Sequence, residues 1–156
     1  MVGGYGAAKA GVAGLMHVAA HEGAEHGILC NAIMPNAASR MAMQAAADWA
    51  ARGRPMDGSL PPAVGNAMNV EFNTPIAVYL ASEACSVTRG LFSQCLGRTA
   101  RVFIGAAHGW QAQRQSAPTV EEIAQHWGEI VDIENGFDVP WTPNEELALV
   151  LGRGAA

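Results

Sequence analysis

Tyr5-Gly-Ala-Ala-Lys9, close to the start of this 156-residue chain, is the most informative part of the sequence. A tyrosine and a lysine four positions apart on a helix project from the same face, about one turn apart. A positive charge beside a phenol favours the phenolate form, so such a tyrosine can pass a proton to or from an alcohol or carbonyl oxygen. The spacing alone is a weak signal, because a surface pair near a helix start has the same pattern. The residues that follow decide between these two interpretations.

The sequence after this pair predicts a helix, a strand and a turn, in that order. Residues 5–25 are rich in Ala and Gly with an apolar face, and Gly27 is of the type that commonly ends helices. Residues 28–33 form a nearly continuous apolar run, which is typical of a parallel strand buried on both faces. Pro35 is expected to end this strand. The order of elements predicts an α/β fold.

Further helices are predicted in the middle of the chain. A helix is expected over 40–51, followed by a long irregular segment that contains several Gly and Pro breakers. Thr74 is expected to act as a helix N-cap with Pro75 in the first helical position, and this helix should run to about Ser82.

The second half of the chain predicts a hairpin and another helix. Residues 91–96 indicate a second strand, 97–100 a turn, and 101–104 a strand that returns beside it. Thr119-Val-Glu-Glu122 has the pattern of a capping box, and apolar residues then follow at helical spacing as far as Val131.

Several segments, taken in order, resemble the C-terminal half of a short-chain dehydrogenase/reductase. They are the helix with Tyr5 and Lys9, the run Asn31-Ala-Ile-Met-Pro-Asn-Ala-Ala-Ser-Arg-Met41, Glu83-Ala-Cys85, Gly90-Leu-Phe92, and the run from Trp127 to Asn135. Most members of that family have Pro-Gly where this chain has Pro35-Asn36. The Pro-Asn variant narrows the resemblance to the (3R)-hydroxyacyl-CoA dehydrogenase part of peroxisomal multifunctional enzyme type 2.

The resemblance implies roles for individual residues. Tyr5 would be the proton donor or acceptor at the substrate oxygen, and Lys9 would support it and hydrogen-bond the nicotinamide ribose. Pro35, Ala38 and Ser39 would lie against the nicotinamide carboxamide, with Ser39 in the place usually held by threonine. The implied cofactor is NAD or NADP, and the residue that distinguishes the two lies in a part of the fold that this sequence does not contain.

The resemblance also implies a domain organisation. No glycine-rich phosphate-binding turn precedes a strand here, since Gly3-Gly4 stands directly before the tyrosine helix. The expected fold is therefore the C-terminal part of a Rossmann-like doubly wound parallel sheet, without its N-terminal nucleotide-binding half. Residues 1–140 would form this portion with 37–72 as the substrate lobe, and 141–156 would be a tail.

The implied activity is the NAD(P)-dependent interconversion of a secondary alcohol and a ketone, with a 3-hydroxyacyl-CoA as the candidate substrate. Four residues of the lobe are candidates for lining an apolar acyl pocket, although ordinary packing explains Met and Trp equally well. These residues are Met41, Met43, Trp49 and Met56. Without a nucleotide cradle, the chain is expected to be a truncated form with little activity alone.

The alternative is a non-catalytic remnant or a partner-dependent oligomerisation module. In the family the tyrosine helix helps to form a dimer interface, so a homo-oligomer through the helix from Tyr5 to Ala24 is expected.

Composition limits the other function classes. Half of the residues are hydrophobic and 15% are charged, which fits a folded protein. The net charge of −5 argues against nucleic acid or an anionic membrane as the partner. No stretch has the length and flanks of a membrane span or a secretory signal, so the cytoplasm is the expected location.

His17 and His21 have a spacing that can hold zinc, but a solvated or packing histidine face is the better explanation, and no metal is expected.

Overall fold

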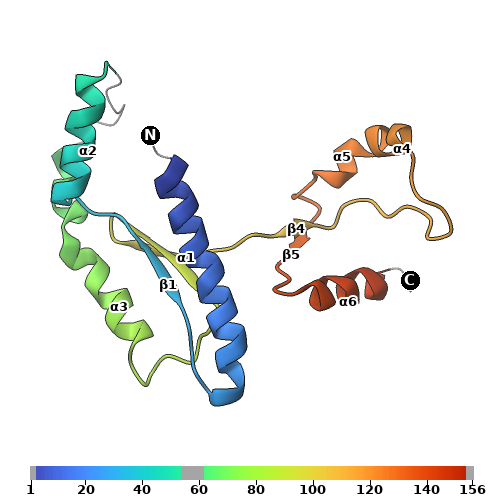
Figure 1. Cartoon of the computed structure of the whole chain (residues 1–156), viewed down its shortest axis with the longest axis horizontal. Helices are drawn as coiled ribbons and strands as arrows, with labels where there is room; N and C mark the ends of the chain where they lie inside the picture. The colour runs from blue at the N-terminus through green and yellow to red at the C-terminus, as the bar shows by residue number, and fades with distance from the viewer. Residues whose placement is uncertain (1–2, 54–61, 154–156) are drawn as a thin grey trace. The chain divides into compact units, whose positions relative to one another are not determined.

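The computed structural model describes residues 3–53 and 62–153. The chain divides into two compact units, Met1–Val102 and Phe103–Ala156. Figure 1 shows the helices and strands of both units.

The first unit begins with a long helix, α1 (Gly3–Glu22), which continues as a 3-10 turn, η1 (Gly23–His26). The turn ends at Gly27, whose φ of 69° lies in the left-handed region that glycine adopts without strain. Met16 and Ala20, one helical turn apart, are the buried residues of α1, at 5% and 0% exposure. The predicted N-terminal helix and its glycine stop are confirmed.

The sheet of the first unit has three strands, β1 (Ala32–Pro35), β2 (Leu91–Cys95) and β3 (Arg98–Val102), in the order β1-β2-β3. β1 is parallel to β2, with Pro35 beside Gln94, and β3 is antiparallel to β2. The α/β class is confirmed, but the described sheet is mixed rather than purely parallel.

The strand predicted over 28–33 is wrong in its position, because β1 begins later. Ile28 and Leu29 are 56% and 46% exposed instead of buried. The backbone N–H of Cys30 donates to the hydroxyl oxygen of Thr88 at 3.0 Å, so a side chain takes the place of a neighbouring strand here. The apolar run over 28–33 therefore includes residues that precede the strand.

The predicted hairpin exists, but with a tighter turn. β2 and β3 are joined by Leu96 and Gly97, whose φ angles are 52° and 81°, as a two-residue hairpin loop with two left-handed positions requires. The predictions of a turn at 97–100 and a returning strand at 101–104 lie too far along the chain. Leucine is an unusual residue for a positive φ, so the sequence contains little signal for this turn.

Between β1 and β2, the described residues form two α-helices and two 3-10 helices: α2 (Arg40–Ala51), η2 (Pro62–Met68), η3 (Val70–Asn73) and α3 (Thr74–Leu80). The helix predicted over 40–51 is confirmed by α2. The predicted capping role of Thr74 is wrong, because η3 runs directly into α3 and Thr74 already has helical backbone angles.

In the second unit, the described residues form a two-stranded antiparallel ribbon and three helices. These are β4 (Ala106–Ala107), β5 (Phe137–Asp138), α4 (Val120–Gln125), α5 (Trp127–Ile130) and α6 (Pro143–Arg153).

The predicted capping box at the start of α4 is confirmed. The Thr119 hydroxyl accepts from the Glu122 N–H at 3.2 Å, and the Glu122 carboxylate accepts from the Thr119 N–H at 2.8 Å. The single helix predicted beyond it is interrupted at His126, whose ring stacks on Trp110. Residues 141–156, which were expected to be a tail, contain the helix α6.

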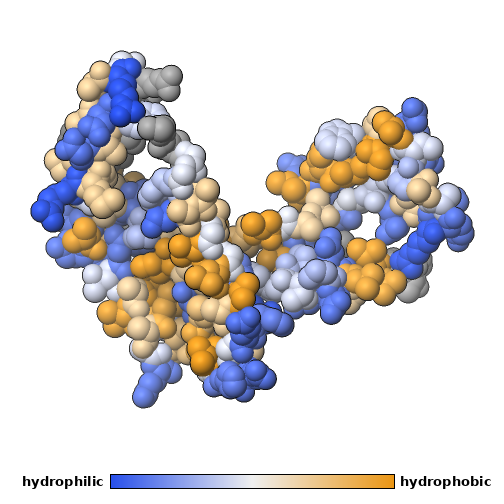
Figure 2. Space-filling model, viewed as in Figure 1, coloured by the Kyte–Doolittle hydropathy of each residue, from blue (hydrophilic) through white to orange (hydrophobic). Residues whose placement is uncertain are grey.

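Few side chains are buried in the part of the chain that the structure describes. The buried apolar residues are Met16, Ala20 and Cys85, and Gln94 is buried with 4% exposure. All four belong to the first unit, whereas in the second unit Ile104 is 92% exposed. Figure 2 shows apolar surface on both units. Both units therefore present surface of the kind that packs against other protein.

Gly90 supplies a stability prediction. A Cβ at this position would collide with the Phe92 ring and would lie 2.9 Å from Asn31 Oδ1. We expect Gly90→Ala to lower the free energy of unfolding by about 1–3 kcal/mol, because the ring must move in a packed region. Gly65→Ala is the control, since a Cβ there meets nothing within 4 Å. Urea unfolding followed by circular dichroism measures both, and equal stability of the two variants would contradict this packing.

Candidate active site

Tyr5 and Lys9 meet near the start of α1, as their spacing predicts. The Lys9 Nζ lies 5.6 Å from the centroid of the Tyr5 ring, close to its face. Tyr5 is 65% exposed and Lys9 is also exposed. The ammonium and the phenol are therefore adjacent, and both are accessible to an incoming molecule.

Tyr5 and Lys9 extend the packed stripe of α1, the helix face that carries the buried residues Met16 and Ala20, toward the N-terminus of the helix. Met16 and Ala20 follow Tyr5 after about three and four helical turns, so these residues and Lys9 share one face of the helix. That face is buried at Met16 and Ala20 and open at Tyr5 and Lys9. In Figure 1 the first residues of α1 lie at the same end of the unit as the carboxyl end of β1. Ligands of parallel α/β sheets bind at that end of the strands.

The turn after β1 is held from two sides by backbone hydrogen bonds. The Asn36 N–H donates to the Gln94 carbonyl oxygen at the end of β2, at 3.0 Å. The Ala38 N–H donates to the Met68 carbonyl oxygen in η2, at 2.8 Å. The turn thus joins the sheet to the predicted substrate lobe.

Asparagine side chains complete this network. The Asn36 side-chain amide donates to Cys95 Sγ at 3.5 Å, and the Asn73 side-chain amide donates to the Asn36 carbonyl oxygen at 3.3 Å. Sequence reasoning missed Asn73 and Cys95, since these partners lie 37 and 59 positions from Asn36. No local pattern marks such distant pairs.

Ser39 is the N-cap of α2. Its Oγ accepts from the Ala42 N–H at 3.2 Å, so its hydroxyl hydrogen is left to donate in another direction. The structure brings Pro35, Ala38 and Ser39 together on one turn. Among the described residues, no hydrogen bond joins this turn to Tyr5.

The acyl pocket predicted in the lobe is not enclosed by the described residues. Met41 and Met43 on α2 are 80% and 67% exposed, and Trp49 is half-buried. Met56 lies outside the described residues.

The described ranges contain neither a metal-ligand cluster nor a helix suited to cross a membrane. No three His, Cys, Asp or Glu side chains within 3–53 and 62–153 gather in a way that could hold a metal ion. His21 Nδ1 lies 3.4 Å from Arg89 Nη2. Within the same ranges, every helix is too short or too polar to span a bilayer.

Comparison with known proteins identifies the family. Residues 1–92, more than half of the chain, match the family described as enoyl-(acyl carrier protein) reductase. The chain is 33% identical over 129 residues to a short-chain type dehydrogenase/reductase of Mycobacterium tuberculosis, covering 83% of this chain and 40% of that protein. It is 30% identical over 132 residues to peroxisomal multifunctional enzyme type 2 of Mus musculus, covering 84% of this chain and 16% of that protein. This chain belongs to the short-chain dehydrogenase/reductase family.

Solved structures agree with this assignment. Full-length peroxisomal multifunctional enzyme type 2 from Drosophila melanogaster superposes with a TM-score of 0.71 at 21% identity, over 94% of this chain and 24% of that one. A short chain dehydrogenase from Mycobacterium avium superposes with a TM-score of 0.55 at 29% identity, over 88% of this chain and 39% of that one. The predicted resemblance is confirmed, and the chain spans less than half the length of each of these relatives.

At this site, side chains offer more free hydrogen-bond donors to a nicotinamide riboside than the backbone does. The Lys9 ammonium and the Ser39 hydroxyl can donate to ribose and carboxamide oxygens. The N–H groups of Asn36, Ala38 and Ser39 already donate to carbonyl oxygens of the protein. Contacts from this turn to a carboxamide would therefore use the Ser39 hydroxyl, the Ala37 N–H or carbonyl oxygens.

The capping role of Ser39 gives a testable prediction. We expect Ser39→Ala to speed hydrogen exchange of the Ala42 amide about five-fold, because losing an N-cap costs about 1 kcal/mol. Ser39→Thr keeps the hydroxyl and should leave exchange nearly unchanged. Ser82→Ala, at the far end of α3, is the control for loss of a serine hydroxyl. Unchanged Ala42 exchange in Ser39→Ala, measured by NMR, would refute the cap.

Proposed function

We propose that this chain carries the proton-transfer residues and the substrate lobe of an NAD(P)-dependent dehydrogenase that interconverts a secondary alcohol and a ketone. The main supporting observation is the Tyr5–Lys9 pair, with the ammonium 5.6 Å from the ring centroid on the open part of the packed stripe of α1. Membership of the short-chain dehydrogenase/reductase family supports an oxidoreductase reaction.

The residues divide the work as follows. Tyr5 accepts the hydroxyl proton during alcohol oxidation and returns it during ketone reduction. Lys9 binds the ribose hydroxyls, to which its ammonium group donates hydrogen bonds. Ser39, with its oxygen held by the Ala42 N–H, donates its hydroxyl hydrogen to the carboxamide oxygen. NAD or NADP, when bound, supplies the acceptor or donor of the hydride.

The proposed substrate is a 3-hydroxyacyl thioester such as an acyl-CoA. The similarity to peroxisomal multifunctional enzyme type 2 supports this class. Met41 and Met43 on α2 offer exposed, flexible apolar side chains of the kind that adapts to an acyl chain.

The activity is proposed for a polypeptide that also supplies a nucleotide-binding half. This chain corresponds to 40% of the Mycobacterium tuberculosis relative and 16% of the mouse enzyme. Alone, the 156-residue chain should bind NAD(H) poorly and turn over little substrate.

A second candidate function is a non-catalytic oligomerisation module. It is favoured by exposed apolar side chains of α1 outside the face that carries Met16 and Ala20, since Leu15 and Val18 are 67% and 51% exposed. Sequencing the coding DNA upstream of Met1 at the native locus separates the two candidates. An in-frame strand followed by a glycine-rich turn supports the dehydrogenase, and a stop codon or unrelated sequence supports the module.

The catalytic proposal predicts a large effect at one of the two tyrosines of the chain. In the protein that includes the nucleotide-binding half, Tyr5→Phe should lower kcat for oxidation of a 3-hydroxyacyl-CoA by about 10²–10⁴-fold, because the proton acceptor is lost. Tyr79→Phe, on α3, should retain the activity. NADH formation measures both. Equal activity of the two variants would refute the role of Tyr5, and robust turnover by the isolated chain would refute the need for a second half.

The proposed homo-oligomer uses the helix from Tyr5 to Ala24. We expect Leu15→Asp to weaken self-association by more than about ten-fold, because a carboxylate would be buried in an apolar interface. Val120→Asp, at an 80% exposed position of α4, is the matched control and should associate normally. Sedimentation velocity measures both. A chain that is monomeric before any substitution, or equal effects of the two variants, would contradict this interface.

A further inference from the structure

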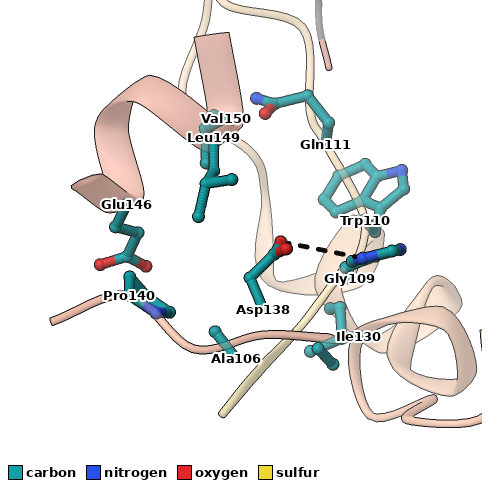
Figure 3. Close-up of a pocket in the computed structure, with 12 residues that line it drawn as sticks. Ala106, Gly109, Trp110, Gln111, Ile130, Asp138, Pro140, Glu146, Leu149 and Val150 are labelled. Carbon is teal, nitrogen blue, oxygen red and sulfur yellow. Dashed lines mark ion pairs between the residues drawn. The ribbon is translucent and has the colours of Figure 1, made fainter. Parts of the chain in front are cut away.

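The second unit contains a cavity of about 340 Å³ that the proposed dehydrogenase reaction does not use. It lies between the ribbon β4–β5, the segment that follows β4, and the helix α6 (Figure 3). Its volume is within the range of about 300–1,000 Å³ that small-molecule sites occupy. Every lining residue belongs to Phe103–Ala156, so the cavity is formed by one unit alone.

Carboxylates give this cavity its charge. Asp138 on β5 and Glu146 on α6 both line it. The Asp138 carboxylate lies 3.8 Å from His108 Nε2, and the Glu146 carboxylate has no hydrogen-bond or ion-pair partner among residues 3–53 and 62–153. The guanidinium of Arg114 donates to the Val150 carbonyl oxygen at 3.3 Å, but Arg114 is outside the lining. The titratable side chains of the lining are thus two carboxylates and the ring of His108.

An aromatic ring and aliphatic side chains form the rest of the walls. In Figure 3, Trp110 and Glu146 stand on opposite sides of the cavity, and Leu149 of α6 points into it between them. The Trp110 ring lies nearly parallel to the His126 ring, with centroids 4.3 Å apart and an interplanar angle of 6°. This stacking fixes the plane of the indole.

The residues that line the cavity favour some classes of ligand over others. An anion such as a phosphate would be repelled by Asp138 and Glu146. A wholly apolar molecule would remove water from the carboxylates and return no hydrogen bond. The described residues around the cavity do not include three ligands placed to hold a metal ion. An ammonium group suits both the carboxylates and the aromatic ring of the lining, because it pairs with carboxylates and is attracted to an indole ring.

We propose that this cavity is a binding site for a small organic cation, an ammonium group attached to a short carbon skeleton. The charge lies between Asp138 and Glu146, the Trp110 ring forms one wall, and the carbon skeleton packs on Leu149 and Val150. This site does not depend on the dehydrogenase activity and is tested without it.

The first test uses the unaltered full chain with choline as the probe. The indole N–H resonance of Trp110, assigned by its loss in Trp110→Phe, should shift in a saturable manner as choline chloride is added. The neutral analogue 3,3-dimethylbutan-1-ol has nearly the same shape and should bind about ten-fold more weakly, because it lacks the charge. No saturable shift with choline, or equal binding of the two compounds, would overturn the proposal.

The second test uses matched charge variants. Glu146→Gln keeps the shape of the side chain and should raise the Kd for choline about three- to ten-fold. Glu121→Gln changes the net charge of the same unit equally but is not in the lining, so its Kd should stay within about two-fold. Equal weakening in the two variants would mean that choline only senses the overall charge, which would overturn the proposal. The comparison with the neutral analogue decides the question even if a variant fails to fold.

Discussion

The hydrogen bonds of the Asn31 side chain are the constraint on which the first unit depends. Its amide oxygen accepts from the Gly90 N–H at 2.9 Å, and its amide nitrogen donates to the Val87 carbonyl oxygen at 2.6 Å. These bonds join the chain just before β1 to the chain just before β2, so they set the register of the parallel pair. A slip by one residue would break both bonds and turn every side chain of β1 to the opposite face. Because the register is set at the start of the strands, Pro35 comes to lie beside Gln94 at their ends, where the candidate active site begins.

Stability and the proposed chemistry share one stripe of α1. Met16 and Ala20 are the residues through which this helix is buried, and Tyr5 and Lys9 are set on the same face by helical geometry alone. The orientation of the pair is thus determined by packing some three turns away. A rigid helix that is anchored at one end can present reactive groups at the other with little added cost in conformational freedom.

Some features that depend on neighbouring residues were predicted correctly from the sequence, whereas contacts between distant residues could not be predicted. The stop at Gly27 and the capping box at Thr119 depend on residues within four positions of each other, and both predictions are confirmed. The start of β1 and the bond from Asn73 to Asn36 depend on partners tens of positions away, which single-sequence patterns do not encode. The helix α6 was not predicted, although its sequence contains a local signal. Its start has a readable signal, a threonine before proline and two glutamates, and the Thr142 hydroxyl does accept from the Glu145 N–H at 3.2 Å.

The two-residue loop at Leu96 and Gly97 has a consequence for the order of folding. It closes the β2–β3 hairpin between neighbours in the chain, whereas pairing β1 with β2 must bring together groups that are 59 positions apart. Loop closure costs about 0.6 kcal/mol more for each doubling of loop length, so the hairpin forms early and β1 joins it late. Until then the edge of β2 has unpaired N–H and carbonyl groups, which are a template for strands of other molecules. We therefore expect aggregation during refolding to concentrate at the strand edge that later borders the candidate active site.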